Sequence, residues 1–368
     1  MADGKKKAHP GHEMTPEREL DLLPAPASVA TASGEPRFGT YQGELPEVDL
    51  SRLKGRWAPA AAPARLLKRK RWHYTLAATP EVLALFAVVD VGYSANAFAV
   101  ALDLKEQRLL CDVSFLGAPG PLAEVGDKPG AGLTASFRTL GGRLTARRGE
   151  DDERYHLQVD VSRLRTGSLQ SFLWNGDLLV AGGPPALTVI APVEGDGFVN
   201  VTQKRGGMLS FGTLEAGGKR FRLDGGVGGT DYTQGYLARH TAWRWAFLAG
   251  RLADGTPVGL NLVEGFNESS GINENALWLG SRLYPLGRAH FEYDRRELMS
   301  PWRIRTGDGA VDLRFQPLYV HREDHDFKVV VSHFAQPLGL FEGTVRVDGQ
   351  THRLSGVPGV TEDQDMLW

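Results

Sequence analysis

Short runs of alternating apolar and polar residues, separated by turn-forming residues, fill most of the chain beyond about residue 37. Three of the separators are Asp254-Gly255, Asp308-Gly309 and Asp348-Gly349, and this dipeptide favours tight hairpins. A period of two is typical of strands, and no long stretch has the period of a helix. Many short strands at regular spacing predict an all-β protein built from antiparallel barrels or sandwiches.

The predicted strands are too many for one ordinary sheet. We therefore divide the chain near the glycine-rich bend at Gly225 to Gly229. Residues 1–36 are polar and rich in Ala and Pro, which predicts a flexible N-terminal arm. Residues 37–229 and 230–368 are then expected to form two separate β-bodies.

The strand that follows this bend has, on both faces, residues that are costly to bury. Alternation places Arg239, Thr241, Trp243, Trp245 and Phe247 on one face, and His240, Ala242, Arg244 and Ala246 on the other. A strand with one solvated face normally alternates apolar with polar residues. Both faces of this strand are therefore expected to contact protein or a ligand cavity.

Composition narrows the classes of partner. Of the 368 residues, 42% are hydrophobic and 23% charged, which is close to globular averages. The net charge of -2 predicts no polyanionic partner, and the aromatic residues lie in core strands rather than in a basic platform, which disfavours nucleic-acid binding. The sole cysteine, Cys111, permits no intrachain disulfide or cysteine zinc cluster, which fits the cytoplasm. Nothing in the sequence predicts a protein partner.

Three features of the sequence bear on membrane association. The basic N-terminus is not followed by an apolar h-region, and no run of eighteen apolar residues exists, so neither a signal peptide nor a membrane helix is expected. A cluster of basic residues could contact phosphates or an anionic membrane surface; it comprises Arg65, Lys68, Arg69, Lys70 and Arg71. The alternative is a solvated edge that protects a strand from aggregation.

Common catalytic and cofactor motifs are absent, including GxSxG, the P-loop, HExxH and the Rossmann fingerprint. We therefore predict no cofactor. His290, Glu292 and Asp294 share one strand face, but the arginines around them favour ion pairs over a metal site. The segment from His321 to Asp326 (HREDHD) is interpreted as a polar connection, not a metal site.

Asp231 is the principal candidate for chemistry. It follows the glycine bend and precedes the strand that contains Trp243 and Trp245. Desolvation near tryptophans would raise the pKa of its carboxyl group, which would make Asp231 a proton donor. The alternative is an aspartate that organises a turn through its own backbone.

Other polar residues are set into aromatic strands of the same region. Asn261 and Glu264 point to opposite faces of one strand, and Glu274 and Asn275 precede an apolar strand, where they could also anchor a loop. The candidate catalytic residues are Asp231 and Glu264. The candidate ligand-binding residues are Tyr232, Gln234, Arg239, His240, Trp243, Arg244, Trp245, Asn261, Glu274, Asn275, Trp278 and Trp302.

Several spaced motifs in the second half carry a family resemblance. They are DYTQGY, RHTAWRWAFLAG, GLNLVEGF, ENALWL, PWRIRTGDGAVDLRF, GLFEGTV and GVTEDQDMLW, in this order. From about Arg37 to its end, the chain resembles the bacterial domain-of-unknown-function family numbered 2804. That family is distantly similar to the superfamily of hydroxyneurosporene synthase (the carotenoid hydratase), AttH-like proteins and lipocalin-type Diels-Alderases. The resemblance implies two tandem lipocalin-like β-barrels with an apolar ligand pocket near their junction.

The resemblance also implies a role for particular residues. In the hydratases an aspartate protonates an alkene, and water or an internal nucleophile captures the carbocation. Asp231, Gly235, Trp243 and Trp245 match the superfamily pattern, so Asp231 would donate the proton and tryptophan faces would stabilise the cation. Arg244 stands where the hydratases tend to carry an acid, and a cation facing the pocket would oppose a carbocation.

Three functions remain open from the sequence. The first is acid-base chemistry (hydration, cyclisation or isomerisation) on a hydrophobic small molecule of terpenoid, polyketide or fatty-acyl type. The second is binding of such a molecule without catalysis. The third is a scaffold without a ligand, for which a solid core around Asp231 and Trp243 is expected.

Overall fold

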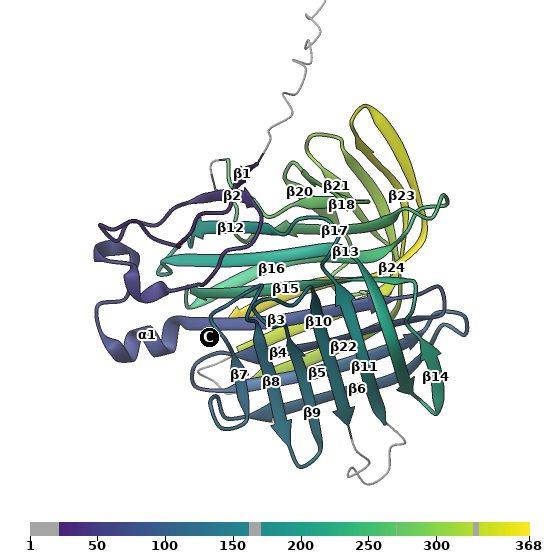
Figure 1. Cartoon of the computed structure of the whole chain (residues 1–368), viewed down its shortest axis with the longest axis horizontal. Coiled ribbons are helices and arrows are strands. Elements are labelled where there is room, and N and C mark those ends of the chain that lie inside the picture. Colours follow the sequence, from purple (N-terminus) through teal and green to yellow (C-terminus); the bar gives the residue numbers. More distant parts are fainter. Residues whose placement is uncertain (1–21, 162–170, 270, 327–330) are drawn as a thin grey trace, which may run out of the picture.

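The computed structural model describes residues 22–161, 171–269, 271–326 and 331–368. In these ranges the chain forms two curled β-sheets, accompanied by three short helices (Figure 1). The prediction of an all-β protein is confirmed. The first sheet is a nearly closed barrel and the second a curled half-barrel, consistent with two tandem lipocalin-like barrels.

The first sheet contains fifteen strands. They are β1 (Leu23–Pro24), β2 (Gly39–Gln42), β3 (Arg69–Ala78), β4 (Val82–Asp90), β5 (Ala95–Asp103), β6 (Arg108–Gly117), β7 (Ala123–Val125), β8 (Thr134–Thr139), β9 (Gly142–Arg147), β10 (Arg154–Val161), β11 (Phe172–Leu179), β12 (Leu187–Pro192), β13 (Val199–Ala216), β14 (Lys219–Arg222) and β15 (Gly226–Tyr236). The main path runs β6-β5-β4-β3-β15-β13-β11-β10-β9-β8-β7. Because β7 returns to lie near β4, the sheet almost closes on itself.

The second sheet contains nine strands. They are β16 (His240–Arg251), β17 (Pro257–Glu264), β18 (Ala276–Leu279), β19 (Arg282–Pro285), β20 (Ala289–Glu292), β21 (Trp302–Thr306), β22 (Val311–Asp326), β23 (Val331–Val347) and β24 (Gln350–Leu367). Their order is β19-β18-β17-β16-β24-β23-β22-β21-β20. The long last strand thus pairs with both β16 and β23 near the middle of the sheet.

The helices lie in the connection between β2 and β3. They are the 3₁₀ helices η1 (Leu50–Arg52) and η2 (Gly55–Trp57) and the helix α1 (Ala62–Lys68), which has a proline in its first turn. Of the expected N-terminal arm, residues 1–21 lie outside the described part of the chain. The described remainder is packed, since β1 pairs with β2, and Val29 and Ala30 are buried.

The boundary between the two sheets lies between Tyr236 and His240, a few residues after the expected division at 229/230. The glycine run is part of a closely paired strand, because β15 pairs with β13 on one side and β3 on the other. A Cβ at Gly228 would lie 2.5 Å from the Leu76 carbonyl oxygen. The glycines thus permit close strand packing, and Asp231 belongs to the first sheet.

Three clusters of buried apolar residues follow from the alternation along the strands. The first fills the barrel, the second lies between the two sheets, and the third fills the half-barrel. In β16, Trp243 and Trp245 face the first sheet, while Ala246 and Leu248 face the half-barrel. Both faces of this strand are therefore covered, as its sequence indicates.

The two sheets approach backbone to backbone at three glycines. A Cβ on Gly259 of β17 would lie 2.5 Å from the nitrogen of Gly207 and 2.7 Å from the Cα atom of Gly206, both in β13. Trp278 packs over the same point, 2.7 Å from where a Cβ of Gly206 would lie. These contacts fix the spacing of the sheets beside the region between them.

We expect Gly259→Ala to destabilise the protein, because backbone atoms cannot move aside as a flexible side chain does. The loss in the free energy of unfolding should be about 1–3 kcal/mol, as for other overpacked sites. Gly307→Ala is the control, since its Cβ would meet only the Arg288 carbonyl oxygen at 3.8 Å. Equal urea midpoints for the two variants would show that the sheets can separate without cost.

Candidate functional site

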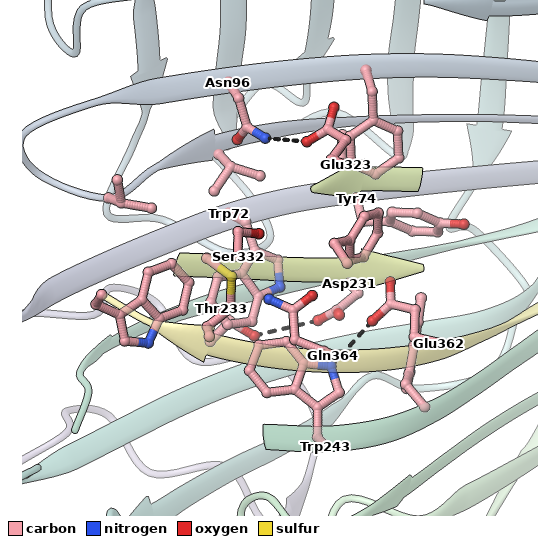
Figure 2. Close-up of a pocket in the computed structure, with 18 of the residues that line it drawn as sticks. Trp72, Tyr74, Asn96, Asp231, Thr233, Trp243, Glu323, Ser332, Glu362 and Gln364 are labelled. Carbon is pink, nitrogen blue, oxygen red and sulfur yellow. Dashed lines mark hydrogen bonds between the residues drawn. The ribbon is translucent and has the colours of Figure 1, made fainter. Parts of the chain in front are cut away.

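A cavity of about 410 Å³ lies between the two sheets (Figure 2). Its walls are mainly apolar; they include Trp72, Val89, Phe98, Trp243, Val263 and Phe334. Cavities of this size and character bind small molecules in other proteins. A ligand site is therefore the natural interpretation of this space.

The cavity residues alternate along strands, as side chains on one face of a sheet must. They include Trp72 and Tyr74 in β3, Asp231 and Thr233 in β15, Lys204 in β13, Trp243 and Trp245 in β16, and Glu362 and Gln364 in β24. The register places Tyr74, Asp231 and Lys204 in one row across three strands of the first sheet. Trp245 and Glu362 form a facing pair in the second sheet.

Lys204 is the cation of the cavity and is held by two carboxylates. Its Nζ lies 2.8 Å from Asp231 Oδ2 and 3.2 Å from Glu274 Oε2. It also lies 5.4 Å from the ring centre of Trp245, within range of a cation-π interaction. All three residues are buried, with at most 5% of their surface exposed.

The charges of this cluster stabilise one another. Burial disfavours the charged form of Lys204, but the carboxylates of Asp231 and Glu274 outweigh burial and raise its pKa. Burial raises the pKa of Glu274, and Lys204 opposes this shift. Asp231 Oδ1 additionally accepts hydrogen bonds from Thr202 at 3.3 Å and from Thr233 at 3.4 Å. Asp231 is thus a paired carboxylate rather than an isolated acid.

Glu362 is a second buried carboxyl group in the cavity wall and has a different environment. Its Oε2 accepts a hydrogen bond from the Trp243 indole at 3.1 Å, and its Oε1 accepts one from the Gln336 amide at 2.7 Å. Burial raises the pKa of Glu362 to about 7. A group with this pKa exchanges its proton readily near neutral pH, as a general acid or base requires.

Sequence reasoning missed Glu362. It lies in the run Thr361 to Asp365, which is wholly polar and therefore resembles solvent-exposed sequence. In the structure Asp363 points the other way, toward Arg295. Alternation along the strand was the available signal. It places Glu362 on the same face as Gln364, Met366 and Trp368, and this face becomes increasingly apolar toward the end of the chain segment.

A second polar network lies at the other side of the cavity (Figure 2). Asn96 donates to Glu323 at 2.8 Å, and both residues line the cavity. Behind them, His321 Nδ1 lies 2.8 Å from Asp112 Oδ1. The interpretation of residues 321–326 as a connection is wrong, because they continue β22. His321 was expected to be solvated, but its ring stacks on Phe98 with the ring centres 4.7 Å apart.

Four of the candidate residues line the cavity: Asp231, Trp243, Trp245 and Glu274. Asn261 lies directly behind them. It accepts a hydrogen bond from the Trp245 indole and donates one to the Glu274 backbone carbonyl, each at 2.7 Å. Asn261 therefore orients a cavity wall without contacting the space itself.

The other candidates lie outside the cavity lining. Alternation turns Tyr232 and Gln234 into the first barrel, where the Tyr232 hydroxyl donates to Gln234 at 2.8 Å. Asn275 accepts a hydrogen bond from the Val263 amide. The remaining candidates also have partners in the protein. The Trp278 indole donates to the Pro185 carbonyl, the Trp302 ring stacks on Tyr293, and Glu264 bonds to the His290 imidazole. His240 bonds to the Asp365 carboxylate, and the backbone amide of Arg239 donates to the Asp196 carboxylate.

The position of Arg244 decides whether its positive charge faces the cavity. Its Nε donates to the Tyr293 hydroxyl at 2.7 Å, and its guanidinium group lies 3.5 Å from Asp363. It therefore belongs to the half-barrel side of β16, opposite the tryptophans. The cation that was expected to oppose a carbocation does not line the cavity.

Two members of the basic cluster of residues 65–71 form ion pairs within the protein. Lys68 pairs with Asp196 at 2.7 Å, and Arg71 with Asp90 at 2.8 Å. Burial lowers the pKa of Lys70 to about 7. Within the described ranges, the chain contains no helix with the length and apolar character needed to span a bilayer.

His290 and Glu292 each contact a neighbouring side chain. His290 bonds to Glu264, and Glu292 pairs with Arg305. Among the described residues, no three His, Cys, Asp or Glu side chains are grouped as a metal site would require.

Comparisons with known proteins give one family and several distant structures. A family model described as "Domain of unknown function (DUF2804)" matches residues 20–368, and no curated protein matches the chain. Three solved structures are similar. A putative AttH from Nitrosomonas europaea has 13% sequence identity and a TM-score of 0.46, and the match covers 85% of this chain and 99% of that one. Kievitone hydratase from Nectria haematococca has 11% identity and a TM-score of 0.47, covering 94% of this chain and 98% of that one. CghA with Sch210972 has 12% identity and a TM-score of 0.46, covering 90% and 99% of the two chains.

We expect Lys204→Met to destabilise the protein by about 3–5 kcal/mol, because two buried carboxylates would lose their shared cation. Chemical denaturation at pH 7 measures this loss. The triple variant Lys204→Met, Asp231→Asn, Glu274→Gln removes all three charges and should recover most of the stability. If the single and triple variants are equally unstable, packing of the lysine chain matters more than its charge.

Glu362 should make stability depend on pH. Its pKa is raised above the ordinary value of 4.5, so the folded state binds its proton more tightly than the unfolded state does. The contribution of this proton to the free energy of unfolding is complete below pH 4.5 and is lost as the pH rises through about 7. Relative to wild type, Glu362→Gln should therefore gain about 3 kcal/mol between pH 4.5 and 8.

Urea unfolding of the wild type and Glu362→Gln at several pH values tests this expectation. The exposed Glu342→Gln variant is the control for loss of one negative charge. A stability difference between wild type and Glu362→Gln that stays constant with pH would contradict the assignment.

Proposed function

The chain belongs to the family described as "Domain of unknown function (DUF2804)", and we propose that it binds a hydrophobic small molecule between its sheets and performs acid-base chemistry on it. The ligand is of terpenoid, polyketide or fatty-acyl type, and the reaction is a hydration, cyclisation or isomerisation. Each of these reactions requires a proton donor or acceptor within an apolar site.

The observation that carries this proposal is the position of Glu362. Its carboxyl group lines the cavity, is buried, and has a pKa raised to about 7 by burial. The Trp243 indole and the Gln336 amide hold the two oxygens in place. An oriented carboxyl group with this pKa transfers protons efficiently near neutral pH.

In a hydration, the acid form of Glu362 gives its proton to one carbon of an alkene. An O–H bond breaks, a C–H bond forms, and the neighbouring carbon becomes a cation. Water then adds to this carbon and returns a proton to the carboxylate. Trp72 and Trp243, whose rings stack on each other with centres 5.9 Å apart, line the cavity, and aromatic rings can stabilise a nearby cation.

The charge cluster beside this site is compatible with a cationic intermediate. Lys204 carries one positive charge, and Asp231 and Glu274 surround it with two carboxyl groups. Its positive charge is therefore compensated within the protein. We assign Asp231 the role of holding Lys204, and Glu362 the proton transfer that sequence comparison gave to Asp231.

Binding without catalysis is the second candidate function. Each carboxylate of Asp231 and Glu362 already accepts hydrogen bonds from the protein, so the cavity can retain an apolar molecule with no reaction. The scaffold hypothesis predicts a solid core around Asp231 and Trp243. Both residues line the cavity, which disfavours that hypothesis.

Incubation with a polyprenoid and fatty-acyl library, followed by mass spectrometry, tests the proposal. Glu362→Gln should reduce turnover by about 100-fold or more, because removal of a general acid typically costs this much. Wild-type turnover in a hydration should fall as the pH rises above 7, because Glu362 loses its proton. Glu323→Gln is the matched control, since it removes a carboxylate from the opposite side of the same cavity.

Three results would change the assignment. Turnover that survives in Glu362→Gln but is lost in Asp231→Asn would return the acid role to Asp231. Unchanged ligand retained by every variant would establish a binder. Absence of both binding and turnover in the wild type would support the scaffold hypothesis.

A further inference from the structure

We infer that the mouth of the cavity docks on an anionic phospholipid bilayer, through helix α1 and the turn between β4 and β5. The inference goes beyond the proposed function, because it assigns a membrane surface as a partner of the protein. It also gives apolar molecules a route into the cavity that avoids water. Docking is measured without a ligand and can therefore be tested on its own.

Apolar side chains are exposed at the cavity mouth and on the adjoining helix. Tyr93, in the turn between β4 and β5, and Leu116, near the end of β6, line the cavity but are 39% and 63% exposed. Leu66 and Leu67 of α1 are 51% and 55% exposed, and no residue of this helix is buried. In Figure 1, α1 lies at the edge of the molecule, outside both sheets. Exposed apolar residues that gather at one place on a surface mark a contact site.

Helix α1 is fastened to the turn that forms the mouth. Lys70 Nζ donates to the backbone carbonyls of Leu67 and Val91, the second at 2.9 Å, and Val91 lines the cavity. Gly92 approaches the Leu66 carbonyl oxygen so closely that a Cβ atom there would clash with it. The two exposed leucines therefore lie beside the cavity mouth, and all these apolar side chains belong to one region of the surface.

The same part of the chain is strongly basic. From Leu50 to Pro80 the sequence contains eight lysines and arginines and no aspartate or glutamate. Lys68 and Arg71 pair with acids of other segments. Arg65 and Arg69 take part in no ion pair within the described part of the chain, so their positive charges are available to a partner. Basic groups beside exposed apolar side chains are the features by which interfacial segments bind anionic lipids.

The charge and the size of this region favour a bilayer over a protein partner. A second copy of the chain would bring the same arginines face to face, and like charges repel. A helix of seven residues is small beside a stable protein interface, which buries roughly 800 Å² on each partner. A bilayer supplies apolar chains for the leucines and anionic headgroups for the arginines. An apolar molecule then passes from lipid to cavity without crossing water.

Sedimentation of the full chain with phosphatidylcholine vesicles, with and without about 30% phosphatidylserine, tests docking. Wild type should bind the anionic vesicles about tenfold more tightly than the neutral ones, and Arg65→Gln with Arg69→Gln should remove most of this preference. Leu66→Ser with Leu67→Ser should weaken binding to anionic vesicles about tenfold, because two apolar side chains no longer enter the bilayer. Leu140→Ser is the matched control, since Leu140 is 95% exposed but lies in the turn between β8 and β9.

A fluorescent label that responds to its environment locates the contact on the protein. Cys111 is buried, so a thiol introduced at the surface is the one that reacts with the label. The NBD fluorophore on Leu67→Cys should become brighter and shift to shorter wavelength when anionic vesicles are added, because the leucine position enters the bilayer. The same fluorophore on Leu140→Cys should keep the emission that it has in buffer.

Three results would overturn the inference. The first is failure of wild type to bind anionic vesicles, or equal binding by wild type and the double variant Leu66→Ser, Leu67→Ser. The second is equal binding to neutral and anionic vesicles, which would exclude a role for the arginines. The third is a wild-type dimer that the double serine variant converts to a monomer, which would assign this surface to a second copy of the chain. None of these results bears on the chemistry proposed for Glu362, because turnover is measured without vesicles.

Discussion

The ion pairs of Lys204 hold together the structure around the cavity. Lys204 and Asp231 are directly opposite in neighbouring strands of the first sheet, whereas Glu274 lies in the connection between β17 and β18 of the second. A buried ammonium group is costly unless it is paired, so its charges are best satisfied when the two sheets meet. The same contact extends through Asn267, which donates to Glu274 at 3.2 Å and accepts from Asn200.

This junction also forms the cavity in which we propose that the chemistry takes place. The two sheets touch closely at their glycines and are held by buried charges, yet they enclose an apolar space beside these contacts. In such a space water is excluded, which raises the pKa of Glu362. The same desolvation therefore favours an apolar ligand and a protonated acid.

Much of the fold could be predicted from the sequence. Period-two alternation and Asp-Gly turns predict antiparallel strands, and the two costly faces of β16 correctly indicate that both are covered. The boundary between the sheets was harder to place, because glycines that permit close strand packing look like a flexible bend. Gly228 and Gly229 lie within β15, where backbone oxygen atoms occupy the space of a side chain.

The site was only partly predictable, for a physical reason. Alternation shows which residues share a face, but it does not show what that face meets. Asp231, Trp243 and Trp245 were identified because aromatic residues stand beside an acid, whereas Glu362 lies in a polar run that resembles solvent-exposed sequence.

The sequence also did not show which cation lies near the tryptophans. Arg244 is adjacent to both tryptophans in sequence but lies on the opposite face of β16, where it meets Asp363. Lys204 is far away in sequence but lies 5.4 Å from the Trp245 ring. The charge nearest to the proposed cationic intermediate is thus set by the packing of two sheets. Because that charge comes with two carboxylates, the cavity can hold a lysine without opposing such an intermediate.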